Sequence, residues 1–524
     1  MRITTYLAAL SLAVGMATAA LSQSLAPTPA SEIDDGAGPY GALLITGATI
    51  VDGSGAPPVG PLDVLVARNR IEAIGGVGSF AERNIDRTID ATGQYVLPGF
   101  VDVHGHNGDP QKAPSSDYAY KLWLAHGVTS VRGVSFDFSA ANQGLTDARR
   151  SAQGEITAPR LFPYGVFGGH WGEDKPQTPA DARRWVQWAK QRGYLGIKFF
   201  NPVTPEILAA ALDESDKLAM GSVAHLGQLG VVDVNGAVAA KLGMDGLTHF
   251  YGHFESLLHG TTVQRFPPDY NYADEQDRFA RVADLAEQVV GPDDERWDEY
   301  LTTLIDEDVT MSPTFNIYSA GRDLARARNF EWHERYTLPS LMEFYTPSRT
   351  NHGSFFFDWT TANEVAWRRF YQAWFPLVRD FANRGGRVTV GSDPGYIYQT
   401  WGFAYVGELE MMQEAGFTPL EVVRAATRNG AEELYAPSGE TPPMGTVRPG
   451  KLADLVILPE NPLQNFKTLY GTGHLRLNDV TGEMERVGGV RFTIKDGIVY
   501  DAKNLLADVE RMVAEARDAT GDRR

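Results

Sequence analysis

The chain has 524 residues, no cysteine and a formal net charge of −19, from 47 basic and 66 acidic side chains. The length accommodates one large domain and a smaller one. The absence of cysteine excludes disulfides, thiolate metal ligands and a cysteine nucleophile. The acidic balance argues against nucleic acid or an anionic membrane surface as a partner.

The N-terminus has the pattern of an export signal. Arg2 provides a short basic start, an apolar run rich in Ala and Leu covers residues 6–21, and Ala19 is one of several small residues that offer a cleavage site. We therefore expect residues 1–23 to be a signal peptide and the mature protein to be periplasmic or secreted, without membrane contact. Residues 24–38, rich in Ser, Pro, Ala and Gly, are expected to be a linker.

Short β patterns separated by turn residues occur near both ends of the chain. They fill residues 39–96, as in Val64-Leu65-Val66, and return in residues 444–503, as in Val456-Ile457-Leu458. The simplest arrangement is one small β-sandwich built from both ends. Residues 504–524 begin in an amphipathic pattern that predicts a C-terminal helix, which packs either on the sandwich or on a neighbouring subunit, so a homo-oligomer stays open.

Strand and helix patterns alternate between these ends, in residues 97–443, and predict an α/β fold, a TIM-type (β/α)8 barrel. Helices are expected at 179–191, 205–218 and 232–242, with helix starts at Asp147 and at Thr204. The eight expected strands end near His106, Val134, Val166, Phe200, His225, Phe250, Phe315 and Asp393.

Two insertions interrupt the expected barrel, at 251–300 before the seventh strand and at 319–380 before the eighth. The second is dense in aromatic residues, including Trp367 and Trp374. These rings either pack the insertion onto the barrel or form a lid over an apolar substrate pocket.

The most informative stretch is residues 97–106, LPGFVDVHGH, in which an apolar run ends in two histidines. Side chains at i and i+2 of a strand share a face, so His104 and His106 would point together. Two imidazoles that converge on one spot suit a divalent metal ion.

Four further polar residues stand at the ends of later expected strands: Lys198, His225, His249 and Asp393. Taken singly, each has a structural explanation: a salt-bridged lysine, a hydrogen-bonded core histidine, or an aspartate that caps a helix. Catalytic groups of such barrels sit where strands end, so their joint occurrence in this order predicts one site.

At this point the chain resembles the amidohydrolase superfamily, in particular its binuclear imidazolonepropionase-like and dipeptidase-like branch. The resemblance covers nearly all of residues 41–500. It rests on the 97–106 stretch, Gly168-Gly169-His170, the four residues above, and the closing 445–455 stretch, GTVRPGKLADL.

The resemblance implies a metal-dependent hydrolase with two divalent metal ions, zinc being expected. His104, His106 and Asp393 would hold one ion, His225 and His249 the other. Lys198, carboxylated at its amine by CO₂, would bridge both. A metal-bridging hydroxide would attack the substrate, and Asp393 would carry the proton.

Three residues are candidates for contact with substrate. His170 matches the family's Gly-Gly-His loop and would orient the substrate or stabilise charge on it. Tyr251 and His253 follow His249 at i+2 and i+4, so a continued strand would direct both toward the site. His126 is expected to cap a helix end, and His352 to be structural or on the surface.

The leading hypothesis for function is hydrolysis of an amide bond in a small molecule: a dipeptide, an N-acyl amino acid or a cyclic amide. A second hypothesis keeps the metal centre and changes the bond to an ester, lactone, carbamate or phosphotriester. A third, from another class, is a non-catalytic binding protein on the same fold. The complete set of ligands argues against the third.

Overall fold

The computed structural model describes residues 35–108, 111–134, 143–200 and 202–520. The signal peptide predicted at residues 1–23 lies outside the described residues. Within the described ranges, no helix combines the length and the apolar character that crossing a bilayer requires.

Eight parallel strands form the central sheet, and strands that follow one another along the chain are neighbours in it. They are β7 (Phe100–Gly105), β8 (Val128–Gly133), β9 (Arg160–Val166), β10 (Gly196–Phe199), β11 (Gly221–Ala224), β12 (Gly246–Thr248), β13 (Thr310–Ser312) and β14 (Arg387–Val388).

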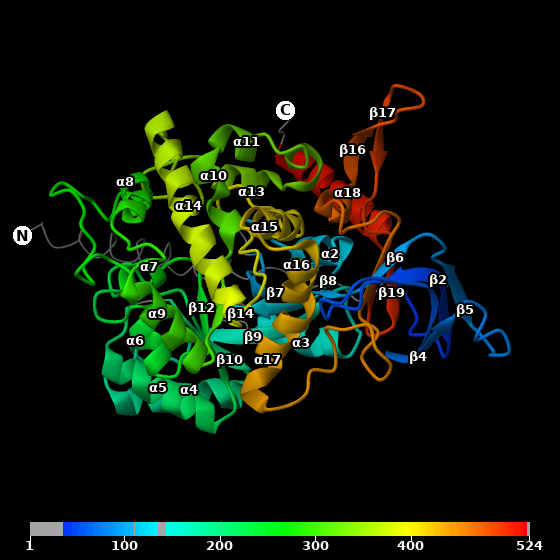
Figure 1. Cartoon of the computed structure of the whole chain (residues 1–524), viewed down its shortest axis with the longest axis horizontal. Helices are drawn as coiled ribbons and strands as arrows, with labels where there is room; N and C mark the ends of the chain where they lie inside the picture. The colour runs from blue at the N-terminus through cyan, green and yellow to red at the C-terminus, as the bar shows by residue number, and fades with distance from the viewer. Residues whose placement is uncertain (1–34, 109–110, 135–142, 201, 521–524) are drawn as a thin grey trace, which may run out of the picture.

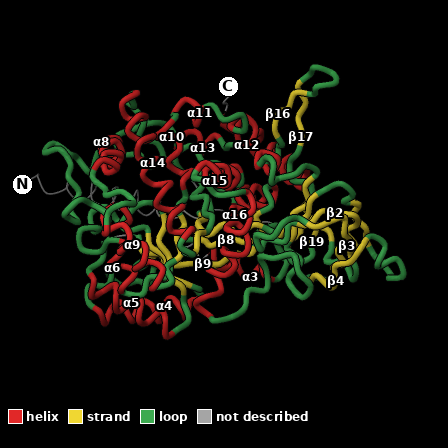
Figure 2. Tube along the Cα trace, in the orientation of Figure 1, coloured by secondary structure: helices red, strands yellow, loops and turns green. Residues whose placement is uncertain are grey.

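The first and last strands meet and close this sheet into a barrel. The Val103 amide donates to the Val390 carbonyl over 3.0 Å, and the Asp393 amide donates to the His104 carbonyl over 2.9 Å. The predicted TIM-type barrel is thus confirmed. Its strands form the yellow centre of Figure 2, with helices around them.

Helices cover the outside of the barrel and connect its strands. They are α2 (Ser116–Ala125), α3 (Gln143–Ala152), α4 (Pro179–Arg192), α5 (Pro205–Lys217), α6 (Gly236–Lys241), α9 (Glu295–Asp306), α14 (Thr361–Asn383), α15 (Phe403–Glu414), α16 (Pro419–Arg424) and α17 (Gly430–Tyr435). Thr204 caps α5 as predicted, its hydroxyl accepting from the Ile207 amide, and His126 ends α2.

One predicted helix start is wrong. Asp147 lies inside α3, because the helix already includes Gln143. The Asp147 side chain is fully buried and accepts a hydrogen bond from the Tyr120 hydroxyl over 3.1 Å. Asp147 therefore makes a buried hydrogen bond between helices and does not start the helix, as the sequence pattern had suggested.

The two insertions are helical. The first contains α7 (His253–Ser256), α8 (Glu275–Val282) and η1 (Ala283–Glu287). The second follows η2 (Phe315–Tyr318) and contains α10 (Ser319–Arg322), α11 (Leu324–Arg328), α12 (His333–Tyr336), α13 (Pro339–Phe344) and most of α14. Figure 1 shows α8, α10, α11, α13 and α14 together along one side of the barrel.

Aromatic rings of α14 pack the second insertion onto the barrel. Trp367, Phe370 and Trp374 are fully buried. Phe370 lies 4.8 Å from the ring of Phe250, which follows β12, and Trp374 lies 4.7 Å from the ring of Phe315. For these rings the structure shows packing, which leaves only the other aromatic residues of the insertion for a lid.

Both ends of the chain build a second sheet, which Figure 1 shows beside the barrel with its blue and red segments together. Its strands are β1 (Gly36–Ala37), β2 (Leu43–Ile50), β3 (Val59–Ala67), β4 (Arg70–Gly76), β5 (Arg87–Asp90), β6 (Tyr95–Pro98), β15 (Leu455–Leu458), β18 (Phe492–Lys495) and β19 (Ile498–Asp501). β1 comes from the stretch expected to be linker.

The sheet folds over itself because β2 pairs with two strands in succession. Its first half pairs with β5 and its second half with β6. Apolar side chains from both chain ends, among them Ile45, Val64, Leu455 and Ile494, are buried together in the fold. A hairpin, β16 (His474–Leu477) with β17 (Met484–Val487), projects from the body (Figure 1).

The predicted C-terminal helix is α18 (Ala502–Thr520). It buries Leu505 and Val509, and its Asp508 is paired with Lys121 of α2. Arg335 of α12 binds Glu510 over 2.7 Å. The helix therefore packs on helices of its own chain.

A buried ion pair joins the barrel wall to α17. Arg132 of β8 pairs with Glu433 over 2.5 Å, and its Nε donates to the Val103 carbonyl over 2.6 Å. We expect Glu433→Ala to lower the free energy of unfolding by about 3–5 kcal/mol, since it leaves a buried guanidinium without its counter-ion. Denaturant unfolding measures this.

The matched control is Glu72→Ala, which breaks the Arg83–Glu72 pair, whose side chains are 50% and 37% exposed. That change should cost less than ~1 kcal/mol. Equal losses for the two variants would contradict the structural role given to the buried pair.

Candidate metal centre

Six polar side chains gather at the carboxyl ends of the barrel strands. His104 lies in β7 and Lys198 in β10, while His106, His225 and His249 directly follow β7, β11 and β12; Asp393 comes from the segment after β14, which ends at Val388. All except His106 are at most 8% exposed. The structure therefore brings together every residue of the predicted ligand set, and we refer to these six as the cluster.

Asp393 stands at the middle of the cluster. Its Oδ1 lies 2.9 Å from His106 Nε2 and 3.6 Å from His104 Nε2, and its Oδ2 lies 3.7 Å from His249 Nε2. Ligand atoms of His104, His249 and Asp393 all lie within 4.8 Å of one another. This spacing fits one cation among these three groups.

His225 lies next to His249, at the edge of the cluster. The ring of His225 lies 4.6 Å from the ring of His249 and 4.3 Å from the ring of Tyr251, on which it stacks. His249 thus stands between His104 and His225, so the described geometry does not divide the ligands into the two separate groups that the resemblance implies.

A threonine sets the orientation of the His249 ring. Thr314 Oγ1 donates to the Pro313 carbonyl over 2.6 Å and lies 2.5 Å from His249 Nδ1. A hydroxyl has a single proton, so if that proton goes to the Pro313 carbonyl, His249 Nδ1 is the donor to Thr314. In that tautomer His249 Nε2 presents a lone pair toward the Asp393 carboxylate.

The backbone beneath the cluster is tied by Asp102. Its carboxylate accepts from the amides of His104 (3.1 Å) and Ser392 (3.0 Å), from the Ser392 hydroxyl, and from Trp123 Nε1 (3.1 Å). These bonds fix the end of β7 against the end of β14. Asp102 therefore holds His104 and Asp393 in register.

Close packing at this junction requires glycine and an unusual backbone. A Cβ on Gly391 would stand 2.6 Å from the Cβ of His104. His249 and Asp393 both have left-handed φ angles, of 66° and 48°. Such conformations cost free energy in residues other than glycine and cluster at functional sites.

Lys198 is buried in the barrel beside these groups, at 3% exposure. Its only hydrogen-bond partner in the described chain is Thr248 Oγ1, at 3.5 Å. Burial lowers the pKa of Lys198 to about 7, although the charge of Asp393 opposes this. The amine is thus poorly stabilised as an ammonium.

Burial also acts on the histidines and the aspartate. Desolvation lowers the pKa of His104 and of His225 well below the usual value, assisted by neighbouring positive charges. Neutral imidazole is the form that binds a metal ion. Burial raises the pKa of Asp393, but the hydrogen bond and charge of His106 outweigh it and bring the pKa to about 2.

The three residues expected to contact substrate lie in different settings. Tyr251 reaches the cluster through its stack on His225. His253 does not continue a strand, because β12 ends at Thr248 and α7 begins at His253, whose Nδ1 lies 2.5 Å from the Tyr300 hydroxyl. His170 is exposed on the loop after β9 and contacts no cluster residue in the described chain.

Two basic side chains near the cluster were not predicted as part of the site from the sequence. His352, expected to be structural or on the surface, binds Glu275 over 3.0 Å, and its charge lowers the pKa of His225 and His249. Lys112 lies 3.5 Å from the centroid of Tyr396, whose ring is 5.5 Å from His106. These residues stand on irregular segments, where no periodicity marks them.

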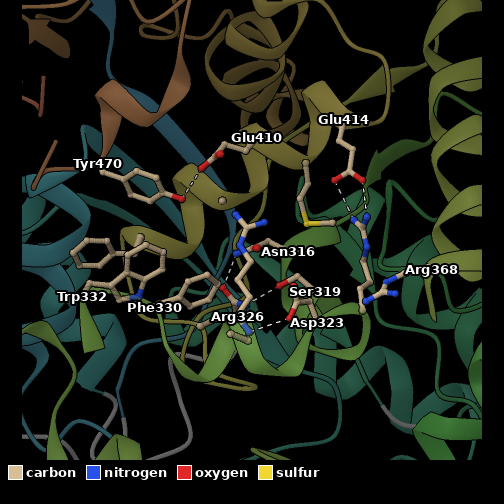
Figure 3. A pocket seen from close by; sticks show the side chains of 16 residues that line it. Asn316, Ser319, Asp323, Arg326, Phe330, Trp332, Arg368, Glu410, Glu414 and Tyr470 are labelled. Carbon is tan, nitrogen blue, oxygen red and sulfur yellow. Dashed lines mark hydrogen bonds and ion pairs between the residues drawn. The ribbon is translucent and has the colours of Figure 1, made fainter. Parts of the chain in front are cut away.

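A surface cavity of about 290 Å³ lies elsewhere, between α10, α11 and α15, as Figure 3 shows. Two of its acidic residues are already paired: Glu414 with Arg322 over 2.6 Å, and Glu410 with the Tyr470 hydroxyl over 2.7 Å. No cluster residue lines it. The candidate centre is therefore the buried cluster.

No family model matches the chain. It is 27% identical over 169 residues to the dihydroorotase of Lactobacillus helveticus, which is 31% of each chain. It is 42% identical over 212 residues to the N-acyl-D-glutamate deacylase of Alcaligenes xylosoxydans xylosoxydans, 39% of this chain and 40% of that one. Each match thus spans less than half of the curated relative.

The fold is similar to the crystal structure of a Xaa-Pro dipeptidase with bound methionine in its active site. The TM-score is 0.57 at 18% identity, over 88% of this chain and 100% of the other. At this identity the similarity shows a shared fold. The sequence matches and the fold agree with the resemblance to the amidohydrolase superfamily.

Proposed function

We propose that this protein is a metal-dependent hydrolase that cleaves an amide bond in a small molecule: a dipeptide, an N-acyl amino acid or a cyclic amide. The observation that carries the proposal is the convergence of His104, His106, Lys198, His225, His249 and Asp393 at one end of the barrel. The names of the sequence relatives, a deacylase and a dihydroorotase, agree with it.

The cluster fits divalent metal ions by the chemistry of its donors. The lone pair of His249 Nε2 faces the Asp393 carboxylate across 3.7 Å, and His104 Nε2 lies 3.6 Å from the same carboxylate. Both gaps exceed hydrogen-bond length, and a lone pair facing an anion is unfavourable unless a cation joins them. Imidazole and carboxylate ligands suit zinc.

Lys198 completes the donor set after a change of chemistry. An ammonium has no lone pair with which to bind a metal ion. A free amine attacks CO₂, forming an N–C bond and releasing one proton, and the resulting carbamate carries two oxygen donors and a negative charge. We propose that Lys198 is carboxylated in this way, which also accounts for a lysine buried without an ion pair.

Bound metal ions would polarise the scissile carbonyl and lower the pKa of a bound water. Side chains of the protein would orient the substrate and transfer the proton of the attacking water. Asp393 stands at the middle of the cluster and its pKa is low, so its carboxylate would accept a proton from the attacking water and deliver it to the leaving nitrogen. Tyr251, stacked on His225, and His170 on its exposed loop are the candidates to contact the substrate.

The direct test is a screen of purified, metal-loaded protein. Dipeptides, N-acyl amino acids and cyclic amides form one arm, and aryl esters, lactones and phosphotriesters the other. We expect about two metal ions per chain and turnover in the first arm. Faster turnover of esters would replace the amide assignment, and bound metal without turnover in either arm would favour a binding protein.

Thr314→Val is expected to weaken metal binding by about 10- to 100-fold, since the variant loses the group that fixes the His249 tautomer. Metal affinity is measured by competition with a chelator. Thr389→Val is the matched control, because Thr389 is equally buried and its hydroxyl has no partner in the described chain. Equal affinities for the two variants would remove the role given to Thr314.

We propose that residues 1–23 direct export and that the mature enzyme acts in the periplasm or outside the cell. The support is the sequence pattern at the N-terminus. Fractionation of cells, with N-terminal sequencing of the mature chain, tests it. Recovery of the uncleaved chain in the cytoplasmic fraction would refute it.

A further inference from the structure

A buried arginine and a buried amide meet beside the cluster. Gln228 lies three residues after His225 in the loop that follows β11, and Arg278 comes from α8 of the first insertion. Their exposures are 6% and 9%. Arg278 Nε donates to Gln228 Oε1 over 2.7 Å, so a residue of the insertion is fixed to a barrel loop next to a candidate ligand.

The hydrogen-bonding groups of Arg278 and Gln228 do not all have partners within the described ranges. Arg278 Nη1 donates to Glu275 over 3.2 Å, but Glu275 is shared with His352 Nδ1, 3.0 Å away. Gln228 Nε2 is buried and has no hydrogen-bond partner within the described ranges. A buried donor without an acceptor is costly, so the free N–H group of Gln228 is available to a ligand.

Ring contacts connect Arg278 to the candidate centre. Its guanidinium lies 5.0 Å from the ring centroid of Phe279, and the Phe279 ring lies 6.1 Å from the ring of Tyr318. The Tyr318 ring lies 5.9 Å from the ring of His249, and its hydroxyl lies 3.4 Å from the Tyr251 hydroxyl. In agreement with this placement, the pKa of His225 is lowered by burial first and, among other charges, by that of Arg278.

Another cation lies beside the cluster. Lys112, which is 6% exposed, stands over the ring of Tyr396, and its charge assists burial in lowering the pKa of His106. Positive charge near the site favours an anionic ligand. A planar carboxylate, which the proposed amide substrates carry, matches the N–H donors of a guanidinium.

We propose that Arg278 and Gln228 form a carboxylate-binding subsite, so that the substrate of this enzyme carries a free carboxylate near the scissile amide. The inference rests on the proposed amide hydrolysis and narrows it. N-acyl amino acids, dipeptides with a free C-terminus and cyclic amides with a carboxylate are substrates, whereas the corresponding neutral carboxamides are poor ones.

The experiment compares N-acetyl amino acids of both chiralities with their α-carboxamides, on metal-loaded protein. We expect the wild type to prefer the acids, and Arg278→Met to raise KM for the acids by about 10- to 100-fold, the range for a hydrogen bond to a charged group. Carboxamide turnover should change by less than about threefold. Gln228→Leu should raise KM for the acids by a smaller factor.

The matched control is Arg281→Met on the same helix, where Arg281 pairs with Asp277 over 3.4 Å and its side chain is 40% exposed. It should leave both substrate series unchanged. Thermal unfolding checks each variant, and Arg278→Lys, which keeps the charge, should recover part of the preference if Arg278→Met unfolds.

The outcomes separate the two proposals. If the wild type cleaves acids and carboxamides equally, or if Arg278→Met slows both series equally, the subsite is refuted while amide hydrolysis stands. If the wild type cleaves neither series, nor the dipeptides and cyclic amides of the screen, amide hydrolysis fails. Calorimetric binding of the same compounds then tests the subsite alone: tighter binding of acids that is lost in Arg278→Met supports it, and equal binding of acids and carboxamides refutes it.

Discussion

Lys198→Ala should leave the barrel folded but reduce bound metal from about two ions to one or none, with kcat/KM lower by at least about 10³-fold. The size follows from losing a donor that would contact both cations together with the hydroxide they activate. Elemental analysis and steady-state kinetics measure the two effects. Removing a lysine that has no ion pair in the structure should itself cost little stability.

Lys198→Arg distinguishes two roles for this lysine, as a positive charge or as a carbamate. Arginine keeps the positive charge and is not converted to a carbamate, so it should be as inactive as the alanine variant. Activity retained in Lys198→Arg would show that position 198 serves as a cation. Carbon-13 NMR of wild type reconstituted with labelled bicarbonate should show the carbamate carbon, and its absence would contradict carboxylation.

Asp393→Asn should lower kcat by about 10²- to 10⁴-fold, the usual contribution of a general acid–base group. The side chain keeps its size, and the backbone bond from residue 393 to the His104 carbonyl is unaffected. Metal content should fall less than turnover does, because three histidines still surround the position. Metal analysis alongside pre-steady-state kinetics measures both.

Asp147→Asn is the comparison for Asp393→Asn. Asp147 is a fully buried carboxylate of α3 whose partners are Tyr120 and Arg150, outside the cluster. It should leave kcat within about twofold of wild type. If Asp393→Asn keeps more than about a tenth of wild-type kcat, another group carries the proton and the role of Asp393 is limited to binding.

The barrel, and the location of the six polar residues at its carboxyl edge, could be predicted from the sequence because both depend on local patterns. Each strand is a short apolar run, and the polar residue that ends it, such as His225 or Asp393, must lie at the carboxyl edge once the strands are parallel. Continuing the strand past His249 was wrong, because the left-handed φ of His249 turns the chain and α7 begins at His253.

The residues around the cluster were not predictable in this way. Arg278 and Gln228 are separated by fifty positions and meet only because an insertion folds back onto a barrel loop. Lys112 and His352 also reach the centre from irregular segments. Their contribution depends on tertiary packing, which no periodic pattern records.

The contact between the first and last barrel strands, at His104 and Asp393, determines when the cluster can be completed. Among the barrel strands, the one that carries His104 is synthesised first and the one that Asp393 follows is synthesised last, and the side chains of these two residues meet where their backbones are hydrogen-bonded. A chain interrupted after the seventh strand holds four histidines and a lysine but no carboxylate to complete them. If the cluster binds metal ions as proposed, they would bind after the barrel has closed and would link its first and last strands, so a chelator should destabilise the barrel first along this edge.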